Sequence, residues 1–181
     1  MRSIYRPPWR IDVTIRDGVR APVGETTLAE AIAQALTAAG APSPPSIGLI
    51  LADDPELATL NEAHLGHDGP TDVLSFPLLV PAEFPTHEGG PARRARRGEP
   101  ATRFALPPGR RRHLGDIVVS VERAIEQAIE GRGGHTGDVR WSPADELRLL
   151  VIHGTLHVCG WDHAEPAEEA AMRALERRLL G

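Results

Sequence analysis

Residues 153–163 read HGTLHVCGWDH and hold three of the eight histidines of the chain. His153 and His157 are four residues apart, so on a helix their imidazoles leave the same face and can share one ion. Gly160 permits the left-handed backbone that ends a helix and turns the chain back. His163 follows this turn, and we therefore expect the three histidines to meet at one point.

Three neutral imidazoles with a fourth position open are typical of a catalytic zinc site, whereas structural zinc sites are usually closed by four protein ligands. Two histidines at this helical spacing would by themselves also fit hydrogen-bonded residues of a buried helix. The third histidine after a glycine turn favours a metal, because H-x-x-x-H-x-x-G-x-x-H is the ligand spacing of one class of zinc peptidases. The sequence thus predicts one zinc ion held by His153, His157 and His163.

The residue after the first histidine indicates whether the predicted metal site can hydrolyse peptides. Zinc peptidases of this spacing place a glutamate there as the general base. This chain has Gly154 at that position, and glycine cannot accept a proton. Peptide hydrolysis is therefore disfavoured unless a carboxylate comes from elsewhere in the fold.

Composition indicates one globular domain over residues 1–181. The chain is 41% hydrophobic, and its single cysteine, Cys159, cannot form an intramolecular disulfide. The first residues lack the apolar segment of a signal peptide, and the longest nearly apolar run, 147–152, is too short to span a bilayer. We therefore expect a cytoplasmic protein without a membrane segment. The net charge of −5 argues against a general nucleic-acid binder.

Residues 81–113 differ from the rest of the chain. They contain eight arginines, three glutamates, six prolines and four glycines, for a net charge of +5. Such a composition buries little apolar surface, which predicts a flexible arginine-rich insertion loop within the domain. Its arginines could pair with RNA phosphates, or the segment could be a solvated linker.

Helix caps and hydrophobic periodicity predict an α/β (α+β) domain, with a four-stranded mixed sheet and packed helices. Thr27 and Glu30 have the spacing of a capping box ahead of a helix that stops at Gly40. Asp54 is expected to cap a second helix that has Pro55 in its first turn. The expected strands are 10–15, 47–52, 72–76 and 116–121, and the later helices cover about 122–129, 142–159 and 166–181.

Four stretches resemble the YbeY family of single-strand-specific, metal-dependent endoribonucleases. They are the histidine segment 153–163, GPTDVLSFP at 69–77, LGDI at 114–117, and the residues 146–151 that lead into the histidines. The resemblance spans about 45–180, apart from the insertion. It implies a compact zincin-like domain and a zinc endoribonuclease of ribosomal RNA maturation and ribosome quality control, with single-stranded ribosomal RNA and ribosomal particles as partners.

The chain departs from this family pattern at two places. The family usually has an aromatic residue followed by an arginine shortly before the PTDV block. That arginine is thought to serve catalysis, and holding a phosphate is one way in which it could do so. This chain has His64 and Leu65 instead, so its phosphate-binding residue stays unassigned. The second departure is the long insertion at 81–113, where the family pattern suggests a short connection.

Several further side chains have alternative interpretations. Asp162 could orient a ligand imidazole or cap the turn. Asp72 and Asp116 stand at expected strand starts, where carboxylates commonly bond nearby backbone amides. Ser75 could face the metal cleft, although a strand serine is more often structural.

The remaining histidines and the residues of the turn are expected to be ordinary. His64 and His67 could approach substrate or metal, but exposed histidines of a loop are the simpler interpretation. Cys159 should point away from the ligands and pack in the core, and Trp161 should anchor the turn rather than stack on a base.

Three functions are compatible with the sequence. An endoribonuclease fits the resemblance best; a zincin-type metallopeptidase would need a carboxylate beside the metal; and a non-catalytic ribosome-associated zinc protein would bind RNA without turnover. No general acid or base is assigned, and the oligomeric state is unknown.

Overall fold

The computed structural model describes residues 1–43, 45–87, 90, 111–130 and 142–181. Most of the expected insertion lies outside these residues. In the described chain the strands are β1 (Arg2–Arg6), β2 (Trp9–Ile15), β3 (Pro45–Ala52), β4 (Val73–Pro77) and β5 (Arg112–Ser120). The helices are α1 (Glu25–Ala38), α2 (Asp54–Leu65), the short 3₁₀ helix η1 (Pro81–Glu83), α3 (Val121–Glu130), α4 (Pro143–Val158) and α5 (Pro166–Leu180).

The strands form one mixed sheet in the order β1-β2-β3-β5-β4. The central pairs β2–β3 and β3–β5 are parallel, and the outer strands β1 and β4 pair antiparallel with β2 and β5. Among the described residues no strand pairs with the outer side of β4, which is therefore an edge of the sheet.

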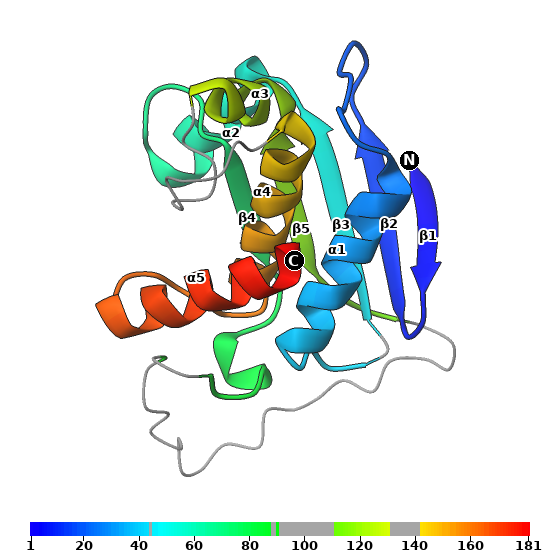
Figure 1. Ribbon diagram of the computed structural model, residues 1–181, viewed down its shortest axis with the longest axis vertical. Helices are drawn as coiled ribbons and strands as arrows, with labels where there is room; N and C mark the ends of the chain where they lie inside the picture. The colour runs from blue at the N-terminus through cyan, green and yellow to red at the C-terminus, as the bar shows by residue number, and fades with distance from the viewer. Residues whose placement is uncertain (44, 88–89, 91–110, 131–141) are drawn as a thin grey trace.

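Two apolar clusters hold the layers together. The larger lies between the sheet and the helices α1, α4 and α5, and it includes Ile47, Ile117 and Leu147, all fully buried. Figure 1 shows α1 and α4 crossing the same face of the sheet. The smaller cluster lies under α2 on the opposite face and includes Leu57 and Val118. Helix α4 is thus packed on a sheet that carries helices on both faces.

The α/β class and the mixed sheet are confirmed, but the sheet has five strands in the described chain rather than the expected four. The missed strand is β1, which pairs with β2 from Arg2↔Val13 to Arg6↔Trp9. Only Ile4 of its five side chains is buried. A short edge strand that buries one side chain has no alternating pattern for the sequence to show.

Two helix starts also differ from the expectation. Helix α1 begins at Glu25 after the cap residue Gly24, so Thr27 lies inside the first turn and forms no capping box with Glu30. Helix α2 is capped by Asp53, whose carboxylate accepts a bond from the Glu56 N–H at 3.0 Å, rather than by Asp54. Both errors are shifts of a few residues at most, which is common at helix ends.

Both ends of the expected insertion belong to the fold. Phe84 after η1 is 3% exposed and lies in the larger core cluster. Strand β5 begins at Arg112, ahead of the expected strand at 116–121.

No helix in the described ranges is long and apolar enough to span a membrane.

Candidate metal centre

Helix α4 places His153 and His157 beside the edge strand β4. Its start is fixed by a capping box in which Ser142 Oγ accepts a bond from the Asp145 N–H at 3.2 Å, and Asp145 accepts one from the Ser142 N–H at 3.3 Å. The Nε2 atoms of the two histidines lie 3.0 Å apart. The expected pairing on one helix face is therefore present.

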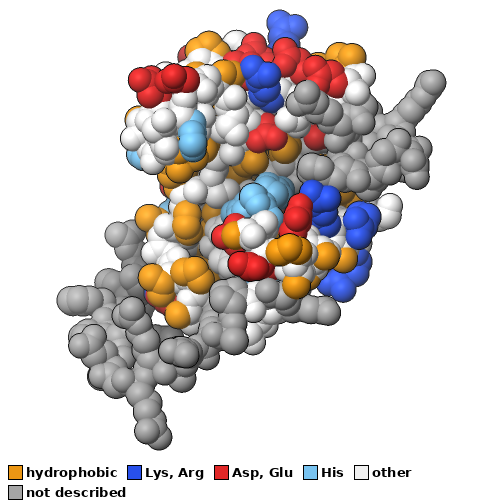
Figure 2. Space-filling view, turned by 90° about the vertical axis from the view of Figure 1, so that its left-hand side faces the viewer, with side chains coloured by type: hydrophobic (Ala, Val, Ile, Leu, Met, Phe, Trp, Pro, Cys, Tyr) orange, Lys and Arg blue, Asp and Glu red, His pale blue; other side chains and the backbone are white. Residues whose placement is uncertain are grey.

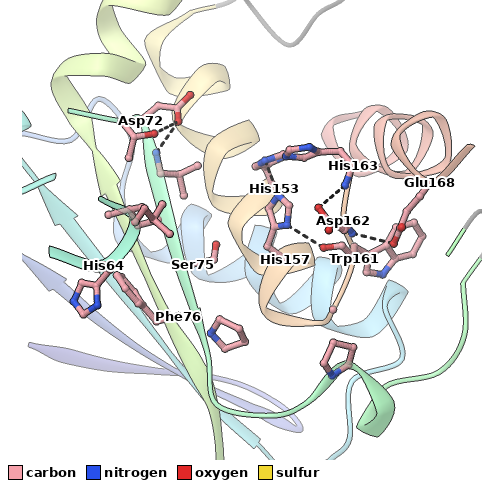
Figure 3. Close-up of a pocket in the computed structure, with 17 residues that line it drawn as sticks. His64, Asp72, Ser75, Phe76, His153, His157, Trp161, Asp162, His163 and Glu168 are labelled. Carbon is pink, nitrogen blue, oxygen red and sulfur yellow. Dashed lines mark hydrogen bonds between the residues drawn. The ribbon is translucent and has the colours of Figure 1, made fainter. Parts of the chain in front are cut away.

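A glycine turn brings the third histidine back to the pair. Gly160 has φ +84°, the left-handed conformation that the sequence predicted, and the Trp161 N–H donates to Leu156 O at 3.1 Å. After this turn, one ring nitrogen of His163 joins one from each of the others, and the three atoms lie within 4.8 Å of one another. Figure 3 shows the three rings facing one another.

The other ring nitrogens of His153 and His157 are held by hydrogen-bond acceptors. Nδ1 of His153 lies 2.7 Å from Oε1 of Glu176, and Nδ1 of His157 lies 2.9 Å from the Trp161 carbonyl oxygen. With Nδ1–H donating to these acceptors, Nε2 keeps its lone pair for a metal ion. Glu176 is 6% exposed and was not expected from the sequence. Its position in the apolar stripe of α5 was the available signal, because a glutamate there needs a buried partner.

The electrostatics of the cluster favour neutral imidazole. Burial, and then the neighbouring His153 and His163, lower the pKa of His157 to about 4. A neutral ring is the form that binds a metal ion. The donor set, its geometry and the protonation state of His157 therefore fit a divalent ion with one or more open positions.

The loop with the third histidine is fixed by a buried carboxylate. Oε1 of Glu168 accepts a bond from the Asp162 N–H at 3.0 Å and lies 2.6 Å from Nε2 of His87. His87 also stacks on Trp161 at 4.0 Å between ring centroids. Asp162 itself accepts a bond from the His163 N–H at 2.8 Å, so of its two interpretations the capping one agrees with the structure. Trp161 packs against the core, as expected for an anchor of the turn.

A groove of about 910 Å³ opens over the histidines along β4. Its walls are the last turn of α2, strand β4 and the loop 160–163 (Figures 2 and 3). His64 and Leu65 line the first wall, and His64 lies edge-on to Phe76 with ring centroids 5.0 Å apart. Of the lining residues that the structure describes, none is arginine or lysine.

A second hollow of about 320 Å³ reaches the same histidines from α5. It shares Asp72, His153 and His163 with the groove and is otherwise lined by α5, including Arg173. The histidine cluster is thus accessible from two sides.

Close packing accounts for Gly154. A Cβ atom on this residue would lie 2.7 Å from Cγ2 of Ile117 and 3.0 Å from Cγ2 of Val73. Ser75 lines the groove and donates to the Gly154 carbonyl oxygen at 3.1 Å, so its hydroxyl ties β4 to α4. A glutamate side chain at position 154 has no room in this arrangement.

The other side chains considered from the sequence do not gather at the histidine cluster as a group. Asp72 accepts a bond from the Val73 N–H at 2.8 Å, as expected of a residue that begins a strand. Asp116 lies within β5 and its Oδ1 is 3.1 Å from Nε2 of His113, so the expected backbone bond at a strand start is wrong for this residue. His67 is exposed and lies outside the groove. Cys159 is 1% exposed in the core, and burial raises the pKa of its thiol to about 12.

One buried acid near the site was not singled out from the sequence. Glu146 lies on α4 about two turns before His153 and is 3% exposed, and its Oε2 has no hydrogen-bond partner among the described residues. Burial, and then the charge of Asp72, raise the pKa of the Glu146 carboxyl to about 7. Glu146 is therefore a carboxyl that holds its proton up to near neutral pH.

Comparison with known proteins gives a consistent family. The family model described as "Endoribonuclease YbeY" matches residues 16–181. Proteins named endoribonuclease YbeY are 36% identical in Roseiflexus castenholzii, over 94% of this chain and 91% of that protein, and 43% identical in Salinispora tropica, over 74% and 71%. The one from Moorella thermoacetica is 38% identical over 88% of each chain.

Among solved structures, the solution structure of a Thermotoga maritima protein aligns with a TM-score of 0.49 and 22% identity. The alignment covers 94% of this chain and 86% of that one.

Proposed function

The chain belongs to the endoribonuclease YbeY family, and from this premise we propose that it hydrolyses single-stranded RNA internally in ribosomal RNA maturation. The observation that carries the proposal is a cluster of three histidines at the floor of an open groove beside an edge strand. Single-stranded ribosomal RNA and ribosomal particles are the proposed partners, in the cytoplasm. Residues 1–181 are proposed to form one domain.

The proposed metal ligands are His153, His157 and His163, and the proposed ion is zinc, one per chain. Zinc bound there supplies a Lewis acid for the scissile phosphate and lowers the pKa of water towards about 7. Glu176 and the Trp161 carbonyl orient two of the rings, and Glu168 fixes the loop that carries the third. Imidazole also suits nickel and iron, so elemental analysis of protein purified without added metal decides the ion.

The shape of the groove supports a preference for unpaired nucleotides. His64, Leu65 and Phe76 give one wall an aromatic and apolar surface, on which a base that is free of its pairing partner can stack. A base within a duplex presents only its edge to such a wall. A peptidase is not favoured, because Gly154 supplies no general base and its surroundings admit no larger side chain.

The test is digestion of an end-labelled RNA that contains both single-stranded and paired segments by zinc-loaded protein. We expect internal cuts confined to the unpaired segments, with casein left intact. His157→Ala should abolish cutting, whereas His67→Ala, a matched change of an exposed histidine outside the groove, should cut like the unmodified protein. Casein cleavage that is lost in His153→Ala would replace the nuclease with a peptidase, and RNA binding without cleavage by fully loaded protein would favour a non-catalytic role.

A further inference from the structure

Apart from the proposed metal ion, the described residues of the groove supply no cation for an RNA phosphate. The described lining includes the carboxylates of Asp72, Asp162 and Glu168 and no arginine or lysine. Leu65, with 58% of its surface exposed, occupies part of the wall with an apolar side chain. A phosphodiester at the histidines would meet the proposed metal ion, but the neighbouring phosphates of the strand meet carboxylates in the described lining of the groove and no side-chain cation.

The second hollow supplies the missing charge. Its described lining contains one arginine, Arg173 on α5, together with His153 and His163 of the cluster. Because both histidines line the groove as well, a strand that lies in the groove and passes over the cluster enters the hollow next to Arg173. Figure 2 shows arginine side chains on one side of the histidines and apolar side chains around the opposite side of the hollowed surface.

Arg173 is held towards this hollow by a weak, replaceable contact. Its Nη2 lies 2.5 Å from Oε1 of Glu169 one turn earlier, and the two side chains are 40% and 39% exposed. An exposed ion pair at this helical spacing contributes little to stability, because solvent screens both charges. The guanidinium carries several N–H donors, so a phosphate can bind beside Glu169 or displace it.

We propose that Arg173 binds a backbone phosphate of the RNA strand next to the histidine cluster, and that Glu169 competes with this phosphate for the guanidinium. The inference rests on the proposed function, because it names the residue with which the same site holds its substrate. Arg173 then serves this chain as the phosphate-binding cation that position 65 does not provide.

The experiment measures the affinity of the zinc-loaded protein for a cleavage-resistant 2′-O-methyl single-stranded RNA by fluorescence anisotropy across a salt series. Arg173→Ala should weaken binding about tenfold at low salt, because a charge-assisted contact is lost, and should reduce the slope of log affinity against log salt by about 0.7, as expected for one phosphate. Arg178→Ala removes an equal charge from an exposed position of the same helix outside the hollow, and it should change affinity by less than about twofold.

The Glu169→Gln variant distinguishes competition from a structural ion pair by the direction in which RNA affinity changes. A merely structural ion pair would make the Arg173 and Glu169 variants similarly harmless or similarly unstable, whereas competition predicts that Glu169→Gln tightens RNA binding severalfold. Equal affinity of Arg173→Ala and Arg178→Ala would overturn the inference. If Arg173→Ala melts early, Glu169→Gln still decides, and unchanged or weaker binding then counts against the proposal. The proposed function is tested separately, by the cleavage assay. Absence of RNA cleavage by the unmodified protein would refute that function, whereas the binding series tests the role of Arg173.

Discussion

Apart from the three ligands, Glu176 is the residue whose side chain we expect to affect metal affinity most. It accepts the Nδ1–H of His153 at 2.7 Å and is nearly buried, so it fixes the ring and makes Nε2 more basic. We predict that Glu176→Ala lowers zinc affinity by about 10- to 100-fold in a competition titration with a chromophoric chelator. Glu165→Ala, at an exposed glutamate directly before the same helix, is the control. Equal affinities of the two variants would show that Glu176 does not act on the metal.

Glu146 should give the fold a recognisable dependence on pH. Its folded pKa of about 7 lies above its ordinary value of 4.5, so the folded state binds the proton more tightly. Below about pH 4.5 the Glu146 carboxyl is protonated in both the folded and the unfolded state and does not change the free energy of unfolding. As the pH rises above 4.5, ionisation favours the unfolded state, and the free energy of unfolding falls by roughly 3 kcal/mol once the pH is well above 7. We predict that Glu146→Gln removes this decline in urea unfolding between about pH 4.5 and 8. A decline of the same size in the variant would assign it to other groups.

Among the secondary-structure elements, the contact of α4 with β4 and β5 depends on Gly154. An alanine there would favour the helix by about 1 kcal/mol in propensity, but its Cβ would lie 2.7 Å from a methyl group of the fully buried Ile117. Overpacking of this kind costs about 1–3 kcal/mol. We predict that Gly154→Ala is destabilised by up to about 2 kcal/mol in denaturant unfolding and shows weaker zinc binding, because α4 shifts relative to the loop. A variant more stable than the unmodified protein would refute the close packing.

The elements also show where sequence reasoning succeeds and where it ends. The spacing of His153, His157 and His163 around Gly160 predicted their meeting, since a helix and one turn determine it locally. Glu176 and Arg173 were not found, because their roles depend on how α5 packs against α4, which no local pattern specifies. Strand β1 was missed for a related reason. The structure pairs it with β2, but its own residues do not alternate between buried and exposed side chains in a way that the sequence would show.

For the whole molecule, the insertion can be shortened only within limits that the structure sets. Phe84 packs in the core, and His87 contacts Trp161 and Glu168 beside the third histidine, so a deletion must begin after these residues. We predict that removal of 91–110, with a short glycine-serine link, leaves the cooperative unfolding transition almost unchanged. A deletion from 86 should instead weaken zinc binding, because it removes the His87 contact with Glu168. Loss of cooperative unfolding in the shorter deletion would show that the removed residues belong to the fold.

The proposed function depends above all on one metal ion, held by the three histidines, that drives cleavage of single-stranded RNA. The initial rate of RNA cleavage, measured as zinc is added stepwise to metal-free protein, tests this dependence without an intermediate step. We expect a rate that rises to a plateau at about one zinc per chain, and a His157→Ala protein that stays inactive throughout the titration. A metal-free protein that cleaves RNA at the full rate, or a His157→Ala variant that reaches the same plateau, would contradict the proposal.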